Sequence, residues 1–225
     1  MSTVSVIVPV LHEPEELERL LESLAALSPA PTEVIVVDGS AGEDAGLIAA
    51  RHGALHLATH AGRGHQLDRG ARRACGEVLW FLHADAEVEA QSLAAINRAI
   101  ADGAVGGWFR FSFRGPPTRR KRALAALINM RCALGGIPYG DQALFATRAA
   151  YAAAGGFPAT PLFEEVPLVK GLRRQGPFAG LRTAIGVSSR RWERDGWLRR
   201  TVANRMLALG YALGVSPERL ARIYR

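Results

Sequence analysis

The sequence of 225 residues contains only two cysteines, Cys75 and Cys132, and only two lysines, Lys121 and Lys170. Two cysteines at this spacing form neither a disulfide framework nor a zinc motif, so we expect reduced thiols. No apolar run reaches the roughly 20 residues that a membrane-spanning helix needs. Met1 leads directly into an apolar run without the basic region of a signal peptide. These absences predict a cytoplasmic protein.

The sequence also lacks glycine-rich phosphate loops. Neither the Walker pattern nor GxGxxG occurs, so an ATPase or a dinucleotide-binding enzyme is not indicated. The segment 9–14 after the first apolar run contains no glycine, which argues against a sugar-phosphate nucleotidylyltransferase. Aromatic residues do not alternate with the arginines as in a stacking platform for single strands, so we expect no nucleic-acid partner.

Acidic residues are scarce in the second half of the chain. Residues 1–113 contain 8 Lys and Arg against 15 Asp and Glu, whereas residues 114–225 contain 20 against 6. A basic half of this kind favours an anionic partner, such as a phosphorylated ligand or an anionic membrane surface. The arginine-rich composition of a GC-rich genome would produce the same excess.

Strand-like and helix-like patterns alternate through the first hundred residues. Apolar runs at 4–10, 33–38, 54–58 and 78–82 predict strands, and the segments 45–51 and 65–75 predict helices. Between the first two strands, Pro14 opens a helix whose apolar residues recur with helical spacing: Leu17, Leu20, Leu21 and Leu24. This alternation predicts βαβ units, an α/β fold and a mainly parallel central sheet flanked by helices.

The pattern changes after about residue 103. Residues 108–113 alternate like a strand, and a basic cluster at 119–122 leads into the apolar segment 123–134. The segment 201–215 is helical and apolar, with Arg205 as its only charge. Two interpretations of these segments remain open. The first is packing against protein, in the core or in a homodimer interface. The second is peripheral contact with the inner face of a membrane. We expect a single domain over 1–225, with a nucleotide-binding half (1–103) and an acceptor half (104–225) that ends in helices.

Four polar features follow strands or lie in the loops beyond them. Asp38 ends one strand, and Asp85 follows the buried run 78–82, so both lie where open α/β sheets bind ligands. Arg63 lies between two glycines before a helix, where a helix N-terminus favours an anion. Glu164 and Glu165 are adjacent acids, which are either helix caps or, in a pocket, carboxylates that raise each other's pKa as a general base requires.

The order of these features resembles the family 2 glycosyltransferases of the GT-A fold over nearly the whole chain. The segments 4–13 and 36–40 resemble the family's first two strand ends, and His83-Ala84-Asp85 resembles its metal-binding DxD motif. The segment 155–165 resembles the stretch that carries the catalytic base. Residues 82–85, 139–142 and 215–220 further resemble a small bacterial subgroup associated by name with arsenosugar biosynthesis.

The resemblance implies transfer of a sugar from a nucleotide-diphosphate sugar to an acceptor hydroxyl, with inversion at the anomeric carbon. It implies that Asp85 binds Mg²⁺ or Mn²⁺, that Glu165 or Glu164 is the base, and that Asp141 and Gln142 line the acceptor side. Arg190 and Arg191, near a faint match to a late family signature, would contact the diphosphate. The nucleotide-sugar contacts implied are Pro9, Glu13, Asp38, Arg63, His83 and Asp85.

The sequence departs from the family pattern at two of these positions. The first acid of the metal motif is replaced by His83, which leaves Asp85 as the metal contact and predicts weaker metal binding. The base position usually holds Asp after Glu, whereas here it holds Glu165. The alternatives to the transferase are a sugar-phosphate nucleotidylyltransferase and a non-catalytic protein that binds nucleotides or anionic surfaces.

Overall fold

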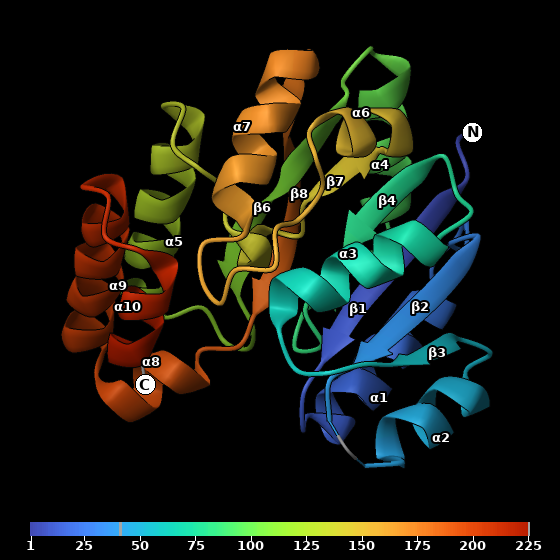
Figure 1. Cartoon of the computed structure of the whole chain (residues 1–225), viewed down its shortest axis with the longest axis horizontal. Coiled ribbons are helices and arrows are strands. Elements are labelled where there is room, and N and C mark those ends of the chain that lie inside the picture. Colours follow the sequence, from blue (N-terminus) through green and yellow to red (C-terminus); the bar gives the residue numbers. More distant parts are fainter. Residues whose placement is uncertain (41, 225) are drawn as a thin grey trace.

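We describe the protein from a computed structural model, whose described residues are 1–40 and 42–224. Within them, eight strands form one sheet in the order β3-β2-β1-β4-β7-β6-β8-β5 (Figure 1). The strands are β1 (Val4–Val10), β2 (Glu33–Asp38), β3 (Leu55–Ala58), β4 (Val78–Phe81), β5 (Glu87–Val88), β6 (Gly106–Phe113), β7 (Phe145–Thr147) and β8 (Phe178–Val187). The helices are α1 (Pro14–Ala25), α2 (Asp44–Arg51), α3 (Arg63–Arg73), α4 (Ser92–Ala101), α5 (Arg119–Ala133), the short 3₁₀ turn η1 (Gly140–Gln142), α6 (Arg148–Ala153), α7 (Glu165–Gln175), α8 (Arg190–Asp195), α9 (Trp197–Ala212) and α10 (Pro217–Ile223).

The predicted parallel βαβ units form one half of the sheet. Strand β1 pairs in parallel with β2 and β4, and β2 pairs in parallel with β3. All seven residues of β1 are buried because its alternate side chains pack in two different cores. Val6 and Val8 share one core with the leucines of α1, while Ile7 packs on the other face with Leu67 of α3. The uninterrupted apolar run is therefore explained by helices on both faces.

The sheet is mixed rather than parallel throughout. Strand β7 runs antiparallel to both β4 and β6, and β5 runs antiparallel to β8. Strands β6 and β8 pair in parallel. The predicted α/β class is confirmed, but the three residues of β7 are too few for their periodicity to show an antiparallel strand in the sequence.

The C-terminal helices gather on the side of the molecule away from α2 and β3 (Figure 1). Helices α5 and α9 bury few of their side chains. The buried residues are Cys132 in α5, and Arg200 and Leu207 in α9. Leu207 packs in a small third core with Phe163 and Leu220. The interpretation that both apolar segments fill a core within the chain is therefore wrong for most of their side chains. Among residues 1–40 and 42–224, no helix is both long enough and apolar enough to cross a membrane.

Candidate active site

A cavity of about 650 Å³ opens beyond the carboxyl ends of β1, β4 and β8. Its walls come from the loops after these strands, the start of α3, the turn η1, the start of α7 and the C-terminal helices. The sequence-predicted acids that line it are Glu13, Asp85, Asp141 and Glu165. The sequence-predicted basic side chains that line it are Arg63, His83, Arg190 and Arg191.

Four other sequence-predicted residues do not line this cavity. Pro9 lies within buried β1, and Asp38 is buried at the end of β2. The Oδ1 atom of Asp38 accepts hydrogen bonds from the backbone and the hydroxyl of Ser40, at 2.8 and 2.5 Å. Because neither residue lines the cavity, their contact with a nucleotide stays a prediction.

Gln142 and Glu164 are the other two. The Gln142 side chain is fully buried, where its Oε1 accepts from the Cys132 thiol at 3.0 Å and its Nε2 donates to the Phe109 carbonyl at 3.4 Å. The side chain therefore joins α5 to β6 within the wall, and only the neighbouring Asp141 faces the cavity. Glu164 is buried and does not line the cavity, but its Oε1 accepts a hydrogen bond from Arg63, which does.

Arg63 joins the two adjacent glutamates. Its Nε bonds Glu164 Oε1, and its second terminal nitrogen lies 3.0 Å from Glu165 Oε1. Glu165 Oε1 also accepts from the backbone N–H of Gly140 at 3.0 Å. Glu164 Oε2 is buried and has no hydrogen-bond partner among the described residues. The single positive charge of Arg63 therefore faces two buried carboxylates, those of Glu164 and Glu165.

The ionisation of Glu165 follows from this setting. Burial raises the pKa of Glu165 to about 7, because the charged carboxylate loses solvation. The Arg63 charge acts to lower this pKa, and the Glu164 charge raises it. Burial raises the pKa of Asp141, which lines the same cavity, to about 6; the Asp85 charge also raises it, and the charges of Arg131 and Arg63 act to lower it.

Two glycines allow the backbone to approach these groups closely. A Cβ at Gly140 would lie 2.6 Å from His83 Nε2 and 2.7 Å from Glu165 Oε1. A Cβ at Gly64 would lie 2.2 Å from the Pro158 carbonyl oxygen. Side chains at these two positions would therefore push apart the segments that bring His83, Arg63 and Glu165 together.

The His83 ring lies close to two positive charges. Burial lowers the pKa of His83 to about 3, and the positive charges of Arg63 and Arg191 act in the same direction. Its Nε2 atom is buried without a hydrogen-bond partner in the described part of the chain. A neutral ring with one unpartnered nitrogen therefore replaces the first acid of the metal motif.

Asp85 and Glu13 form the acidic end of the cavity. Burial raises the pKa of each carboxyl, and the Asp85 charge raises the pKa of Glu13 further. Arg191 acts to lower both pKa values. No group of three or more His, Cys, Asp or Glu side chains arranged to hold a metal occurs within residues 1–40 and 42–224.

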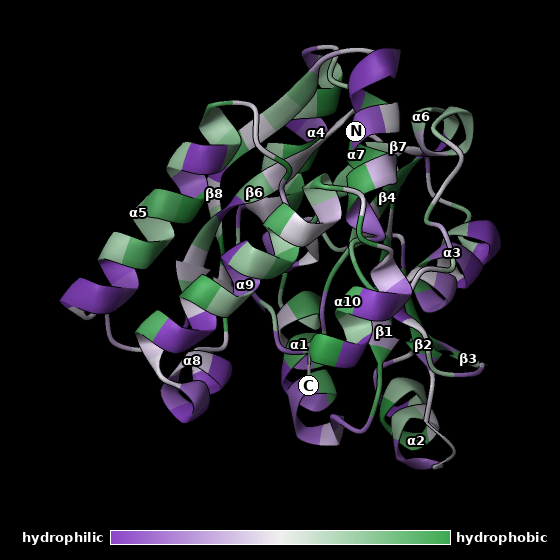
Figure 2. Ribbon diagram, turned by 60° about the vertical axis from the view of Figure 1, so that its left-hand side comes forward, coloured by the Kyte–Doolittle hydropathy of each residue, from purple (hydrophilic) through white to green (hydrophobic). Residues whose placement is uncertain are grey.

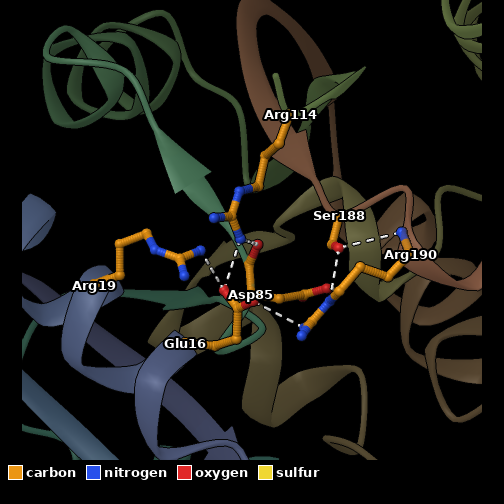
Figure 3. A network of polar contacts seen from close by, with 6 residues as sticks. All are labelled: Glu16, Arg19, Asp85, Arg114, Ser188 and Arg190. Carbon is orange, nitrogen blue, oxygen red and sulfur yellow. Dashed lines mark hydrogen bonds and ion pairs between the residues drawn. The ribbon is translucent and has the colours of Figure 1, made fainter. Parts of the chain in front are cut away.

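A network centred on Glu16 holds the Asp85 loop in place (Figure 3). Glu16 is 7% exposed and pairs with Arg114 at 2.7 Å and with Arg190 at 2.9 Å. Arg114 also donates to the backbone carbonyl of Asp85 at 3.1 Å. Glu16 and Arg114 are not among the residues predicted from the sequence. The helical spacing of the leucines in α1 could have identified Glu16, because it places this acid on the face that the helix buries.

The C-terminal helices also contribute to the cavity wall, and the sequence did not predict which of their residues do so. Arg200 of α9 is 8% exposed, lies 3.3 Å from Asp195 and stacks over the ring of Tyr224 at 4.7 Å. The Tyr224 hydroxyl accepts from Arg191 at 3.3 Å. This part of the wall combines arginine with aromatic and apolar side chains, including Phe163 and Leu207.

Comparisons with known proteins give one family match and a set of solved structures with the same fold. A family model described as glycosyl transferase family 2 matches residues 5–153, which is well over half of the chain. No curated protein matches significantly.

Solved structures share the fold at low sequence identity. Glucosyl-3-phosphoglycerate synthase from Mycobacterium tuberculosis, in complex with Mn²⁺, UDP and phosphoglyceric acid, has a TM-score of 0.64 and 20% identity over 95% of this chain and 79% of its own. A mannosyltransferase from Pyrobaculum calidifontis, in complex with GDP-mannose and Mn²⁺, has a TM-score of 0.60 and 22% identity over 83% of this chain and 55% of its own. The predicted GT-A-like fold is confirmed.

Proposed function

Because the chain belongs to glycosyl transferase family 2, we propose that it transfers a sugar from a nucleotide-diphosphate sugar to an acceptor hydroxyl, with inversion. The observation that carries the proposal is that Asp85 and Glu165 line one cavity of about 650 Å³. In the reaction, the acceptor oxygen bonds to the anomeric carbon while the bond from that carbon to the diphosphate oxygen breaks. The proton of the acceptor passes to the base.

The acidic end of the cavity suits a divalent cation. Mg²⁺ and Mn²⁺ prefer oxygen ligands, and sites for nucleotide diphosphates commonly use one or two carboxylates with phosphate oxygens. Asp85 and Glu13 supply two carboxylates whose pKa values are raised, so a cation there would relieve their repulsion. Asp85 would hold the metal, which supplies charge stabilisation for the leaving diphosphate. The solved structures that share the fold contain Mn²⁺ with their nucleotides.

Glu165 is the better candidate of the two for the base. It lines the cavity, and its pKa of about 7 matches a group that accepts a proton near neutral pH. Glu164 does not line the cavity and is bound to Arg63. We therefore assign proton transfer to Glu165, and orientation of Glu165 to Arg63 and the Gly140 N–H.

Arginines near the mouth of the cavity fit the diphosphate. Arg191 lines the cavity and lowers the pKa of Asp85, which places its charge near the acidic end. Arg190 reaches Glu16 from the same turn. We assign both to the diphosphate, Asp141 to the acceptor side, and the halves 1–103 and 104–225 to donor and acceptor. The arsenosugar-named subgroup remains a proposal, supported by segments 82–85, 139–142 and 215–220.

Nucleotide binding measured by calorimetry tests this function. UDP, GDP, CDP and their sugar conjugates are titrated with and without Mn²⁺ into wild type, Asp85→Asn and the control Asp102→Asn. Asp102 is an exposed carboxylate after α4, so the control loses the same charge outside the cavity. We expect Mn²⁺-dependent binding of one nucleotide, retained in Asp102→Asn and lost in Asp85→Asn. Absence of binding for every nucleotide, or equal binding in both variants, would contradict the proposal.

A further inference from the structure

Helix α5 exposes apolar side chains that nothing in the described chain covers. Leu127 and Met130 are 53% and 54% exposed, and Leu134 follows directly after the helix at 80%. These three residues are spaced by three and four positions, so they lie on one side of the helix. Cys132 is the buried residue of α5, and it faces Gln142 on the inner side.

Helix α9 exposes a longer apolar stripe. Its exposed large apolar residues follow one another at intervals of three or four, which places them along one side. Green, hydrophobic segments run along both α5 and α9 in Figure 2. The residues of the α9 stripe are Leu198, Val202, Met206, Leu209 and Leu213, each at least half exposed. We call the exposed apolar residues of α5 and α9 together the α5–α9 face.

The charges on both helices have one sign. Helix α5 carries five Arg or Lys residues and α9 carries three, and neither contains Asp or Glu. Arg120, Arg122, Arg199 and Arg205 are exposed. An apolar face among cations, with no acid on either helix, has the composition of a surface that enters the headgroup region of an anionic bilayer.

A small groove lies between α5 and α9, next to the catalytic cavity. It encloses about 70 Å³, and its lining combines apolar side chains such as Leu124 and Ile128 with the charged Arg131 and Arg205. The groove and the main cavity share wall residues, among them Tyr139 and Asp141. The side of the cavity assigned to the acceptor therefore lies directly behind the two helices that carry the α5–α9 face.

We infer that the α5–α9 face docks on an anionic lipid bilayer, and that the acceptor is an amphiphile presented from that bilayer. The apolar part of the acceptor stays in the bilayer against the α5–α9 face, and its hydroxyl reaches the cavity at Asp141 and Glu165. The statement about the acceptor rests on the proposed function, whereas bilayer docking does not.

A second copy of this chain fits the face less well than lipid does. In a two-fold dimer through the α5–α9 face, the same helices face each other. The exposed cations of one copy would then oppose those of the other, with no acid from either helix between them; these are Arg119, Arg120, Arg122, Arg199 and Arg205. Anionic headgroups neutralise the same cations while the acyl chains cover the apolar stripe.

Vesicle binding tests the docking surface with a matched pair of variants. The full-length protein is sedimented with vesicles of phosphatidylcholine alone, and with vesicles of equal parts phosphatidylcholine and phosphatidylglycerol. Met206→Ser removes one apolar side chain from the face, and Leu47→Ser removes one from α2, where it is equally accessible. The two side chains are 61% and 60% exposed, so neither exchange disturbs a core. Arg199→Gln tests the charge.

We expect binding to the anionic vesicles that weakens about tenfold in Met206→Ser and is unchanged in Leu47→Ser. Arg199→Gln and added salt should also weaken it, because headgroup attraction is screened. No binding to either vesicle type, equal binding to both, or equal loss in both serine variants would overturn the inference. A dimer that Met206→Ser dissociates, without vesicle binding, would assign the face to a second copy.

Mn²⁺-dependent binding of UDP, GDP and CDP, measured on the same variants without vesicles, distinguishes failure of the docking surface from failure of the proposed function. Retained nucleotide binding without vesicle binding overturns the docking surface and the acceptor presented from the bilayer, but not the transferase. Vesicle binding without nucleotide binding overturns only the transferase and the statement about the acceptor.

Discussion

The pH dependence of turnover tests the assignment of Glu165 as the base. A base must be ionised to accept a proton, and burial sets the pKa of Glu165 at about 7, compared with 4.5 for an unperturbed glutamate. At pH 5, a carboxyl with the raised pKa is ionised in roughly 1 molecule of 100, whereas an unperturbed one is ionised in about three quarters. We therefore expect kcat/KM at pH 5 to lie about 100-fold below its plateau.

The assay follows release of the nucleoside diphosphate from the donor that binds best, with water as acceptor, between pH 5 and 9 at constant ionic strength. Glu165→Gln keeps the size of the side chain and removes its ability to accept the proton. We expect this variant to lose about 10²- to 10⁴-fold in kcat and to lose the acidic limb of the profile.

Asp141→Asn is the matched control, because burial also raises the pKa of Asp141, to about 6. It should keep the limb that Glu165 causes. A midpoint near 4.5, a limb that persists in Glu165→Gln, or a limb that disappears in Asp141→Asn would refute the assignment.

Three further changes test the framework of the site. The raised pKa of Asp141 means that the folded state binds its proton more tightly, so this group should lower stability by about 3 kcal/mol between pH 3.8 and 6; in urea unfolding, the stability of wild type relative to Asp141→Asn should fall by this amount, while the fall that Glu165 causes is present in both proteins. Arg114→Met removes the donor to the Asp85 carbonyl, and calorimetry should show Mn²⁺-dependent nucleotide affinity lowered about tenfold; unchanged affinity would contradict a positioning role. Phe109→Ala empties a fully buried site beside Trp80 and should cost about 3–5 kcal/mol in urea unfolding, whereas a cost below about 1 kcal/mol would show that the site collapses.

The local patterns of the first half were sufficient to predict its architecture. The apolar run of β1 and the leucine spacing of α1 each reflect burial by neighbours in the same βαβ unit. Because such strands end at one sheet edge, the sequence also predicted that Asp85 faces a cavity, as the structure shows.

The remaining features depend on contacts between distant parts of the chain. The adjacent glutamates differ because Glu165 lines the cavity while Glu164 lies behind Arg63, a residue about one hundred positions earlier. Gln142 turns inward because Cys132 and the Phe109 carbonyl offer partners there. A sequence pattern shows residue types but not which distant partner orients each one.

For the α5–α9 face, the sequence shows two apolar segments but does not show what covers them. The composition of both segments is that of core helices, and the sequence left open whether a core, a second copy or a membrane covers them. The structure excludes a core within the chain for Leu127 or Met206, which are more than half exposed. Amphipathic spacing identifies a covered side, but it does not identify what covers it.

The position of β5 at the edge of the sheet has a consequence for how the chain folds. Strand β4 pairs with β1, so its place is fixed by residues made early in synthesis. A few residues later, β5 pairs with β8, at Gly186 and Ile185. The segment between β4 and β5 carries Asp85, so the strand pairing at its far end forms only after β8 has emerged from the ribosome. A chain that stops after β7 would contain every strand of the parallel half and both Glu16 and Arg114, but it would lack the strand that pairs with β5 just after Asp85.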